Sequence, residues 1–305
     1  MAIRLGLQIP NFSYRTGVEK LFPTVIAQAR EAESAGFDSV FVMDHFYQLP
    51  MLGSPDQPML EAYTALAALA TATERVQLGT LVTGNTYRNP SLLGKIITTL
   101  DVVSQGRAIL GIGTGWFELE HDQLGFDFGT FTDRFNRLDE ALQIILPMLK
   151  GERPTFSGAW YHTTEALANP RLRDHIPLMI GGSGEKKTIP LAARHFDHLN
   201  VIAGFDELPG KVQVVQRRCE EIGRDPATLE TSVLITVVID ENFKPDQIPA
   251  EMSQRMVVGS PESVADQIKT NVLDAGIDSL IINMPFYTPG VISAAGEVLR
   301  PLVGL

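Results

Sequence analysis

Apolar residues along the chain follow two alternating patterns. Short apolar runs, typical of buried strands, are followed by longer segments with apolar residues three and four positions apart, typical of amphipathic helices. The strands are predicted at Ile3–Ile9, Asp38–Met43, Val76–Thr83, Ala108–Ile112, Pro177–Ile180, His198–Ile202, Thr231–Ile239 and Ser279–Met284. The helices are predicted at Val18–Ala35, Glu61–Thr73, Ser91–Ser104, Phe131–Lys150, Glu185–His195, Leu208–Ile222, Pro261–Ala275 and Ser293–Leu302.

This alternation of strand and helix predicts an α/β fold with parallel strands. Eight such units favour a (β/α)8 TIM barrel, with a doubly wound open sheet as the alternative. We expect one domain over residues 1–305, because no change in composition marks a boundary. Residues 151–176, rich in Gly and Pro, predict a hairpin or irregular insertion before strand five, and the polar segment Asp240–Pro249 predicts a second one after strand seven.

Composition narrows the class of protein. The 305 residues are 44% hydrophobic, enough for a large core, and carry a net charge of −11, which argues against binding nucleic acid or an anionic membrane. The apolar runs are too short for a membrane span, and the N-terminus has no signal-peptide pattern. With Cys219 as the only cysteine, no internal disulfide is possible, and we expect a cytoplasmic protein that acts on a small molecule.

A glycine turn follows the fifth predicted strand, at Gly181-Gly182-Ser183-Gly184. Glycines let a ligand approach the bare backbone, and the first turn of the next helix has unpaired amides at its positive end. The turn is therefore a candidate phosphate site, although many such turns only make a tight corner. It has neither the Gly-Lys-Thr ending of a Walker loop nor a Gly-x-Gly-x-x-Gly spacing.

In a TIM barrel the functional site lies where the strands end at their C-terminal face. The residues at these ends are mostly small and polar, which suits a flat, flavin-like ring with its phosphate at the glycine turn. They include Asn11, Asp44, His45, Thr83, Asn85, Gly113, Thr114, Gly115, Gly181, Gly182, Ser183, Gly184 and Asn283. Trp116, next in the chain, is either an aromatic wall beside the ring or a cover for the barrel rim.

His45 is the candidate for proton transfer, because it follows a strand directly and histidine titrates near neutral pH. The alternative is a polar loop start with Asp44 capping a turn. Glu118, Glu120 and His121 form a second ionisable cluster, read either as a solvated helix face or as a substitute for His45. Nothing in the spacing predicts a metal site or a serine nucleophile.

Four segments, in this order, resemble the bacterial luciferase-like superfamily, in particular its oxidoreductases that depend on coenzyme F420, a deazaflavin. They are Phe37–His45, Leu78–Pro90, Ser104–Trp116 and Ile180–Gly184. The resemblance covers nearly the whole chain and implies a TIM barrel, an insertion before strand five and a homodimer. It also implies that His45 faces the reactive centre of the deazaflavin, with Asp44 beside it.

The resemblance further assigns cofactor contacts. Thr80–Thr83, with Leu81 and Val82, matches a bulge behind the ring that often holds a non-proline cis peptide. Gly113–Gly115 matches a cofactor-contacting turn, and Gly181–Gly182 matches the phosphate site; Asn85, Ser183 and Gly184 are expected to join them. In the sugar-phosphate dehydrogenases of the family a glutamate acts as an acid where this chain has Trp116, so a sugar-phosphate substrate is not predicted. Asn11, Trp116 and Asn283 are assigned to the substrate pocket.

The predicted function is therefore an oxidoreductase that transfers hydride between F420 and a small organic substrate. The protein would orient the reactants, while the hydride chemistry belongs to the cofactor. Two alternatives remain open at this point: an FMN-dependent monooxygenase supplied by a separate reductase, and a non-catalytic F420-binding carrier or sensor.

Overall fold

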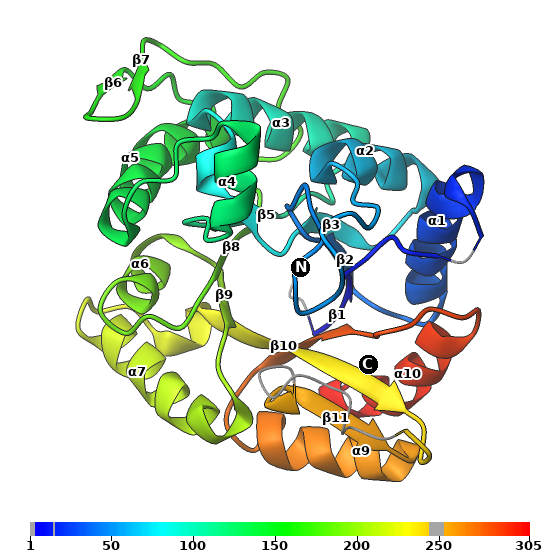
Figure 1. Ribbon diagram of the computed structural model, residues 1–305. Coiled ribbons are helices and arrows are strands. Elements are labelled where there is room, and N and C mark those ends of the chain that lie inside the picture. Colours follow the sequence, from blue (N-terminus) through cyan, green and yellow to red (C-terminus); the bar gives the residue numbers. More distant parts are fainter. Residues whose placement is uncertain (1–3, 15, 244–252) are drawn as a thin grey trace.

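Parallel strands at the centre of the molecule are surrounded by helices (Figure 1). The computed structural model describes residues 4–14, 16–243 and 253–305. The strands are β1 Leu5–Ile9, β2 Ser39–Val42, β3 Gln77–Thr80, β4 Thr83–Gly84, β5 Leu110–Gly113, β6 Phe156–Ser157, β7 His162–Thr163, β8 Leu178–Gly181, β9 His198–Val201, β10 Glu230–Ile239, β11 Met256–Gly259 and β12 Ser279–Asn283.

The helices lie in the connections between these strands (Figure 1). The α-helices are α1 Val18–Ser34, α2 Ala62–Ala72, α3 Pro90–Val103, α4 Glu118–Leu124, α5 Phe131–Leu149, α6 Thr188–His195, α7 Leu208–Glu220, α9 Pro261–Ile268 and α10 Val291–Leu299. The short helices are η1 Asn85–Tyr87, η2 Phe205–Glu207, η3 Pro226–Thr228, η5 Lys269–Leu273 and η6 Arg300–Val303, of which η5 is a π-helix. Within the described ranges, no helix combines the length and apolar content needed to cross a bilayer.

The strands form a nearly closed barrel. Hydrogen-bonded neighbours follow the order β3-β2-β1-β12-β10-β9-β8-β5-β4, and every pair along this path is parallel. A bridge between Leu78 of β3 and Ala108, just before β5, closes the barrel, because β3 and β4 are parts of one barrel strand and both lie beside the strand of β5. The predicted (β/α)8 TIM barrel is confirmed, and the open doubly wound sheet is excluded.

The third barrel strand is interrupted where the pattern predicted one strand over Val76–Thr83. The peptide bond between Leu81 and Val82 is cis, and these two residues separate β3 from β4. The break agrees with the bulge that the family resemblance implied at this place. A period-two pattern cannot reveal it, since the apolar run continues through both residues.

The core has two parts. Inside the barrel, Phe41, Ile109, Met179 and Ile281 pack together at almost zero exposure. A larger apolar layer lies between the strands and the surrounding helices. Strands buried on both faces explain why the sequence shows continuous apolar runs where half-buried strands would alternate.

Two connections differ in part from the prediction. The segment before strand five contains the antiparallel hairpin β6–β7, as expected. The second predicted insertion is Asp240–Pro249, and its residues 244–249 lie outside the described part of the chain. The prediction did not include β11, which pairs with the second half of β10. Finally, α6 begins at Thr188, later than the predicted Glu185.

Candidate functional site

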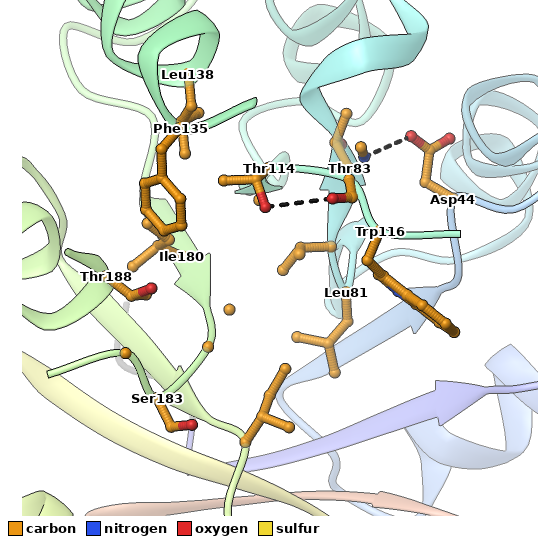
Figure 2. Close-up of a pocket in the computed structure, with 18 of the residues that line it drawn as sticks. Asp44, Leu81, Thr83, Thr114, Trp116, Phe135, Leu138, Ile180, Ser183 and Thr188 are labelled. Atoms are coloured by element: carbon orange, nitrogen blue, oxygen red, sulfur yellow. Dashed lines mark hydrogen bonds between the residues drawn. The ribbon is translucent and has the colours of Figure 1, made fainter. Parts of the chain in front are cut away.

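A cavity of about 430 Å³ opens at the C-terminal end of the barrel. Figure 2 shows Phe135 and Thr188 on one side of it and Asp44 and Trp116 on the other. Its wall is built from the ends of barrel strands two to six, with α5 and α6 beside them. The lining residues are Asp44, His45, Leu81, Val82, Thr83, Gly84, Tyr87, Gly113, Thr114, Gly115, Trp116, Phe131, Phe135, Leu138, Ile180, Gly181, Gly182, Ser183, Gly184, Thr188 and Ile202.

Most of the residues predicted for the site line this cavity. Three do not: Asn11 lies after β1, Asn85 is buried with its amide near the Tyr161 hydroxyl, and Asn283 pairs with Thr236. Their assignment to cofactor or substrate therefore gains no support from the cavity. The roles of the lining residues stay predictions, although the structure brings these residues to one place.

Bare backbone forms much of the cavity floor. A Cβ atom added to Gly113 would lie 3.0 Å from Val82, and one added to Gly181 would lie 3.2 Å from the same side chain. Gly182 has a φ of +142°, and a Cβ there would meet Thr188 at 2.9 Å. A side chain at Gly182 would be strained, and one at Gly113 or Gly181 would crowd Val82, so these positions favour glycine.

An ion-pair network supports the side of the cavity at β2. The Asp44 carboxylate, 2% exposed as a residue, accepts two hydrogen bonds from Arg88 at 2.7 and 2.9 Å and one from the Gly84 amide at 3.0 Å. Arg88 also donates to Glu61 at 2.6 Å, at the N-terminus of α2. Asp44 thus ties the end of β2 to the interrupted third strand and fixes the backbone that carries His45.

A buried carboxylate orients His45. Oε2 of Glu120 lies 2.9 Å from Nδ1 of His45, and Glu120 has zero exposure. The same carboxylate accepts hydrogen bonds from the amides of Phe46 and Tyr47 and from the Tyr87 hydroxyl. Burial acts to raise the pKa of Glu120, but the hydrogen bond and charge of His45 and the other donors outweigh it and lower the pKa.

This arrangement determines which ring nitrogen of His45 is available. An ionised Glu120 can only accept hydrogen bonds, so Nδ1 of His45 carries a hydrogen and donates a hydrogen bond to the carboxylate. Nε2 then remains for a ligand, as an acceptor in the neutral ring and as a donor in the protonated ring. The ring is also packed edge-on against Trp116 and Phe117, with centroids 5.7 and 5.8 Å apart.

The cluster after strand four is not a solvated helix face. Glu120 and His121 have zero exposure on α4, and His121 lies 2.7 Å from both the Thr86 hydroxyl and the Phe117 carbonyl oxygen. Burial lowers the pKa of His121. The short helix therefore buries Glu120 and His121 against the rest of the protein, and Glu118 lies on its exposed side.

Several lining residues were not predicted. Phe131, Phe135 and Leu138 come from α5, Thr188 from α6 and Ile202 from the end of β9. The sequence signal for the α5 residues is an apolar face at helical spacing, which also fits ordinary packing against the barrel. Among the described residues, no group of three or more His, Cys, Asp and Glu side chains is placed to hold a metal ion.

Fold and cavity together place the chain in a known class. The profile of the family described as luciferase-like monooxygenase matches residues 4–244. The chain therefore belongs to the luciferase-like monooxygenase family.

Curated relatives within this class carry a more specific name. An F420-dependent glucose-6-phosphate dehydrogenase of Nakamurella multipartita is 30% identical over 90% of this chain and 91% of that protein. Another from Amycolatopsis mediterranei is 32% identical over 89% of this chain and 92% of that protein. A third, from Microbacterium testaceum, is 37% identical over 58% of this chain, and that match spans only 52% of the relative.

Solved structures share the architecture. An F420-dependent secondary alcohol dehydrogenase in complex with an F420-acetone adduct has a TM-score of 0.85 over 99% of both chains, at 22% identity. The coenzyme F420 dependent tetrahydromethanopterin reductase of Methanopyrus kandleri has a TM-score of 0.79 over 99% of this chain and 100% of that chain, at 18% identity. At these identities the similarity shows the fold alone.

Proposed function

We propose that this protein is an oxidoreductase that binds coenzyme F420 and transfers hydride between the cofactor and a small organic substrate. The observation that carries the proposal is the juxtaposition of a histidine held by a buried carboxylate with a cavity floored by glycine backbone. Relatives named F420-dependent glucose-6-phosphate dehydrogenase support the choice of cofactor.

The residues of the cavity fit this cofactor. A flat ring needs a floor without side chains, which Gly113 and Gly181 supply, and Leu81 and Val82 offer an apolar surface against it. A phosphate needs backbone that it can approach closely, which Gly182 to Gly184 supply. F420, when bound, would accept or supply a hydride at C5 of its deazaflavin ring.

His45 would accept or donate the proton that is transferred together with the hydride. When an alcohol is oxidised, its carbon loses a hydride and its hydroxyl loses a proton, which passes to Nε2 of His45. In the reverse direction protonated His45 returns that proton to the carbonyl oxygen. Glu120 stabilises the imidazolium and holds the ring in one orientation, as a carboxylate does for a catalytic histidine.

Two substrate classes follow from different observations. Glucose 6-phosphate is the first candidate, because it appears in the names of the relatives. Neutral alcohols are the second, because the described residues that line the cavity include no lysine or arginine to pair with a substrate phosphate. Trp116, about half exposed at the rim, offers such a substrate an apolar contact.

The decisive experiment is a titration of the purified protein with F420 and, separately, with FMN. We expect F420 to bind more tightly and to be reduced when glucose 6-phosphate or a member of an alcohol panel is added. Tighter binding of FMN would overturn the proposal in favour of a flavin monooxygenase. Binding of F420 without turnover across the panel would instead indicate a carrier or sensor.

A further inference from the structure

We propose that a second groove, beside the cavity, binds the acidic oligoglutamate tail of F420. This inference rests on the proposed function and extends it to a part of the surface with no assigned role. The groove has a volume of about 510 Å³ and lies between α5, α6 and the β6–β7 hairpin. We call it the α5–α6 groove; its lining residues are Phe135, Asn136, Asp139, Glu140, Gln143, Phe156, Trp160, Lys186, Lys187, Pro190, Leu191 and Arg194.

The α5–α6 groove adjoins the glycine turn. Phe135 lines both the cavity and the groove. Lys187 lines the groove, and the next residue, Thr188, lines the cavity beside Gly182 and Gly184. A chain that leaves the turn along the start of α6 therefore enters the groove without crossing another element.

The groove carries cations that form no ion pair with the described carboxylates. Lys186 and Arg194 are exposed, and neither makes an ion pair with any carboxylate in the described parts of the chain. The ammonium of Lys187 lies over the ring of Phe135, 5.1 Å from its centroid, which holds it at the groove wall. In a protein with a net charge of −11, such a local excess of unpaired cations favours an anionic ligand.

The acidic residues of the groove do not cancel this charge. Both carboxylate oxygens of Glu140 accept hydrogen bonds from the amides of Ala159, Trp160 and Tyr161, so this carboxylate belongs to the hairpin. Asp139 remains as the one further carboxylate among the lining residues. The three cations of the groove are therefore balanced by one carboxylate, that of Asp139, which accepts no hydrogen bond from the hairpin amides.

The chemistry of F420 matches this arrangement. The cofactor carries a phosphodiester, and beyond it a chain of glutamyl residues that each add a free carboxylate. With the phosphate at Gly182–Gly184, these carboxylates would meet Lys186, Lys187 and Arg194 in turn. Because the pairs are exposed, each contributes little and is screened by salt.

The test compares F420 with several glutamates and the tail-less cofactor that ends at the phospholactyl group. We measure the Kd of each by fluorescence, at low and at high salt. We expect the glutamylated form to bind about three- to tenfold tighter at low salt, with most of the difference lost at high salt. The double variant Lys186→Gln/Arg194→Gln should lose this preference and keep the affinity for the tail-less form.

The matched control is Lys20→Gln/Lys269→Gln, which removes the same charge from exposed positions outside the groove, on α1 and η5. It should keep the preference for the glutamylated form. Equal binding of the two cofactor forms by the wild type would overturn the groove proposal and leave the proposed function standing. A preference unchanged in the groove variant would also overturn it, whereas binding of neither form would overturn the proposed function itself.

Discussion

At the scale of single residues, the pairing of His45 with Glu120 is the feature on which the proposed chemistry depends. The first prediction concerns His45→Ala. The contacts proposed for the phosphate and ring come from other strands, so F420 affinity should stay within a few fold. Turnover should fall about 100-fold or more, the usual scale for loss of a positioned acid or base.

Equilibrium titration and steady-state kinetics on His45→Ala separate the two possibilities. His162→Ala provides the control, since this histidine is exposed on the β6–β7 hairpin. If His45 only packs against Trp116 and Phe117, the variant would lose stability or cofactor affinity while its folded fraction kept its rate.

The second prediction treats Glu120 as a positioning residue and concerns how the stability of Glu120→Gln depends on pH. In the folded protein the pKa of Glu120 lies below the ordinary value of 4.5. The ionised carboxylate therefore contributes its full stabilisation above pH 4.5, and this stabilisation is lost as the pH falls through the folded-state pKa. Wild type should therefore be more stable than Glu120→Gln near neutral pH. The difference in the free energy of unfolding between the two proteins should narrow below about pH 4.5, and urea unfolding at a series of pH values measures it.

Kinetics test the same variant independently. Loss of the charge that orients His45 should lower kcat about 10- to 100-fold, by analogy with the carboxylates that orient metal-binding histidines. Glu118→Gln, on the exposed side of α4, is the matched control. A Glu120→Gln enzyme with wild-type kcat and an unchanged pH–rate profile would contradict the positioning role.

At the scale of elements, the turn between β8 and α6 has a backbone that only glycine adopts without strain. The third prediction is that Gly182→Val lowers F420 affinity at least tenfold, or about 1.4 kcal/mol. Valine would meet Thr188 and penalise the φ of +142°. Gly223→Val is the control, because Gly223 also has a positive φ of +72° but has no atom near its Cβ position and lies outside the cavity. Unchanged affinity in a folded Gly182→Val protein would remove the phosphate assignment.

The link between β2, the third strand and α2 depends on one guanidinium. The fourth prediction is that Arg88→Met destabilises the protein by roughly 3–5 kcal/mol, because Asp44 would be left buried and unpaired. Denaturant unfolding measures this effect. Adding Asp44→Asn to Arg88→Met should recover part of the loss, whereas additive effects would show that the pair is not coupled.

At the scale of the whole molecule, periodicity was sufficient for the barrel because its strands are buried on both faces and its helices are amphipathic. It could not show the break at Leu81–Val82 or the strand β11, since both depend on pairing partners distant in the sequence. The glycine turn and His45 were visible because strand ends converge in any barrel. The sequence offered Glu120 only as a substitute for His45 and not as its partner, because only the folding of α4 onto the barrel brings the two side chains together. The expected homodimer and cytoplasmic location stay predictions.

The cavity draws on the ends of barrel strands two to six, while β1, β10 and β12 contribute none of its described lining. The two halves of the barrel mouth are therefore expected to evolve under different constraints. Under the proposed function, cofactor binding would constrain the half that lines the cavity, and substitutions there are expected to accumulate slowly. Substitutions at the ends of β1, β10 and β12 would leave cofactor affinity unchanged. Changes confined to these three strand ends could therefore alter which substrate the barrel accepts.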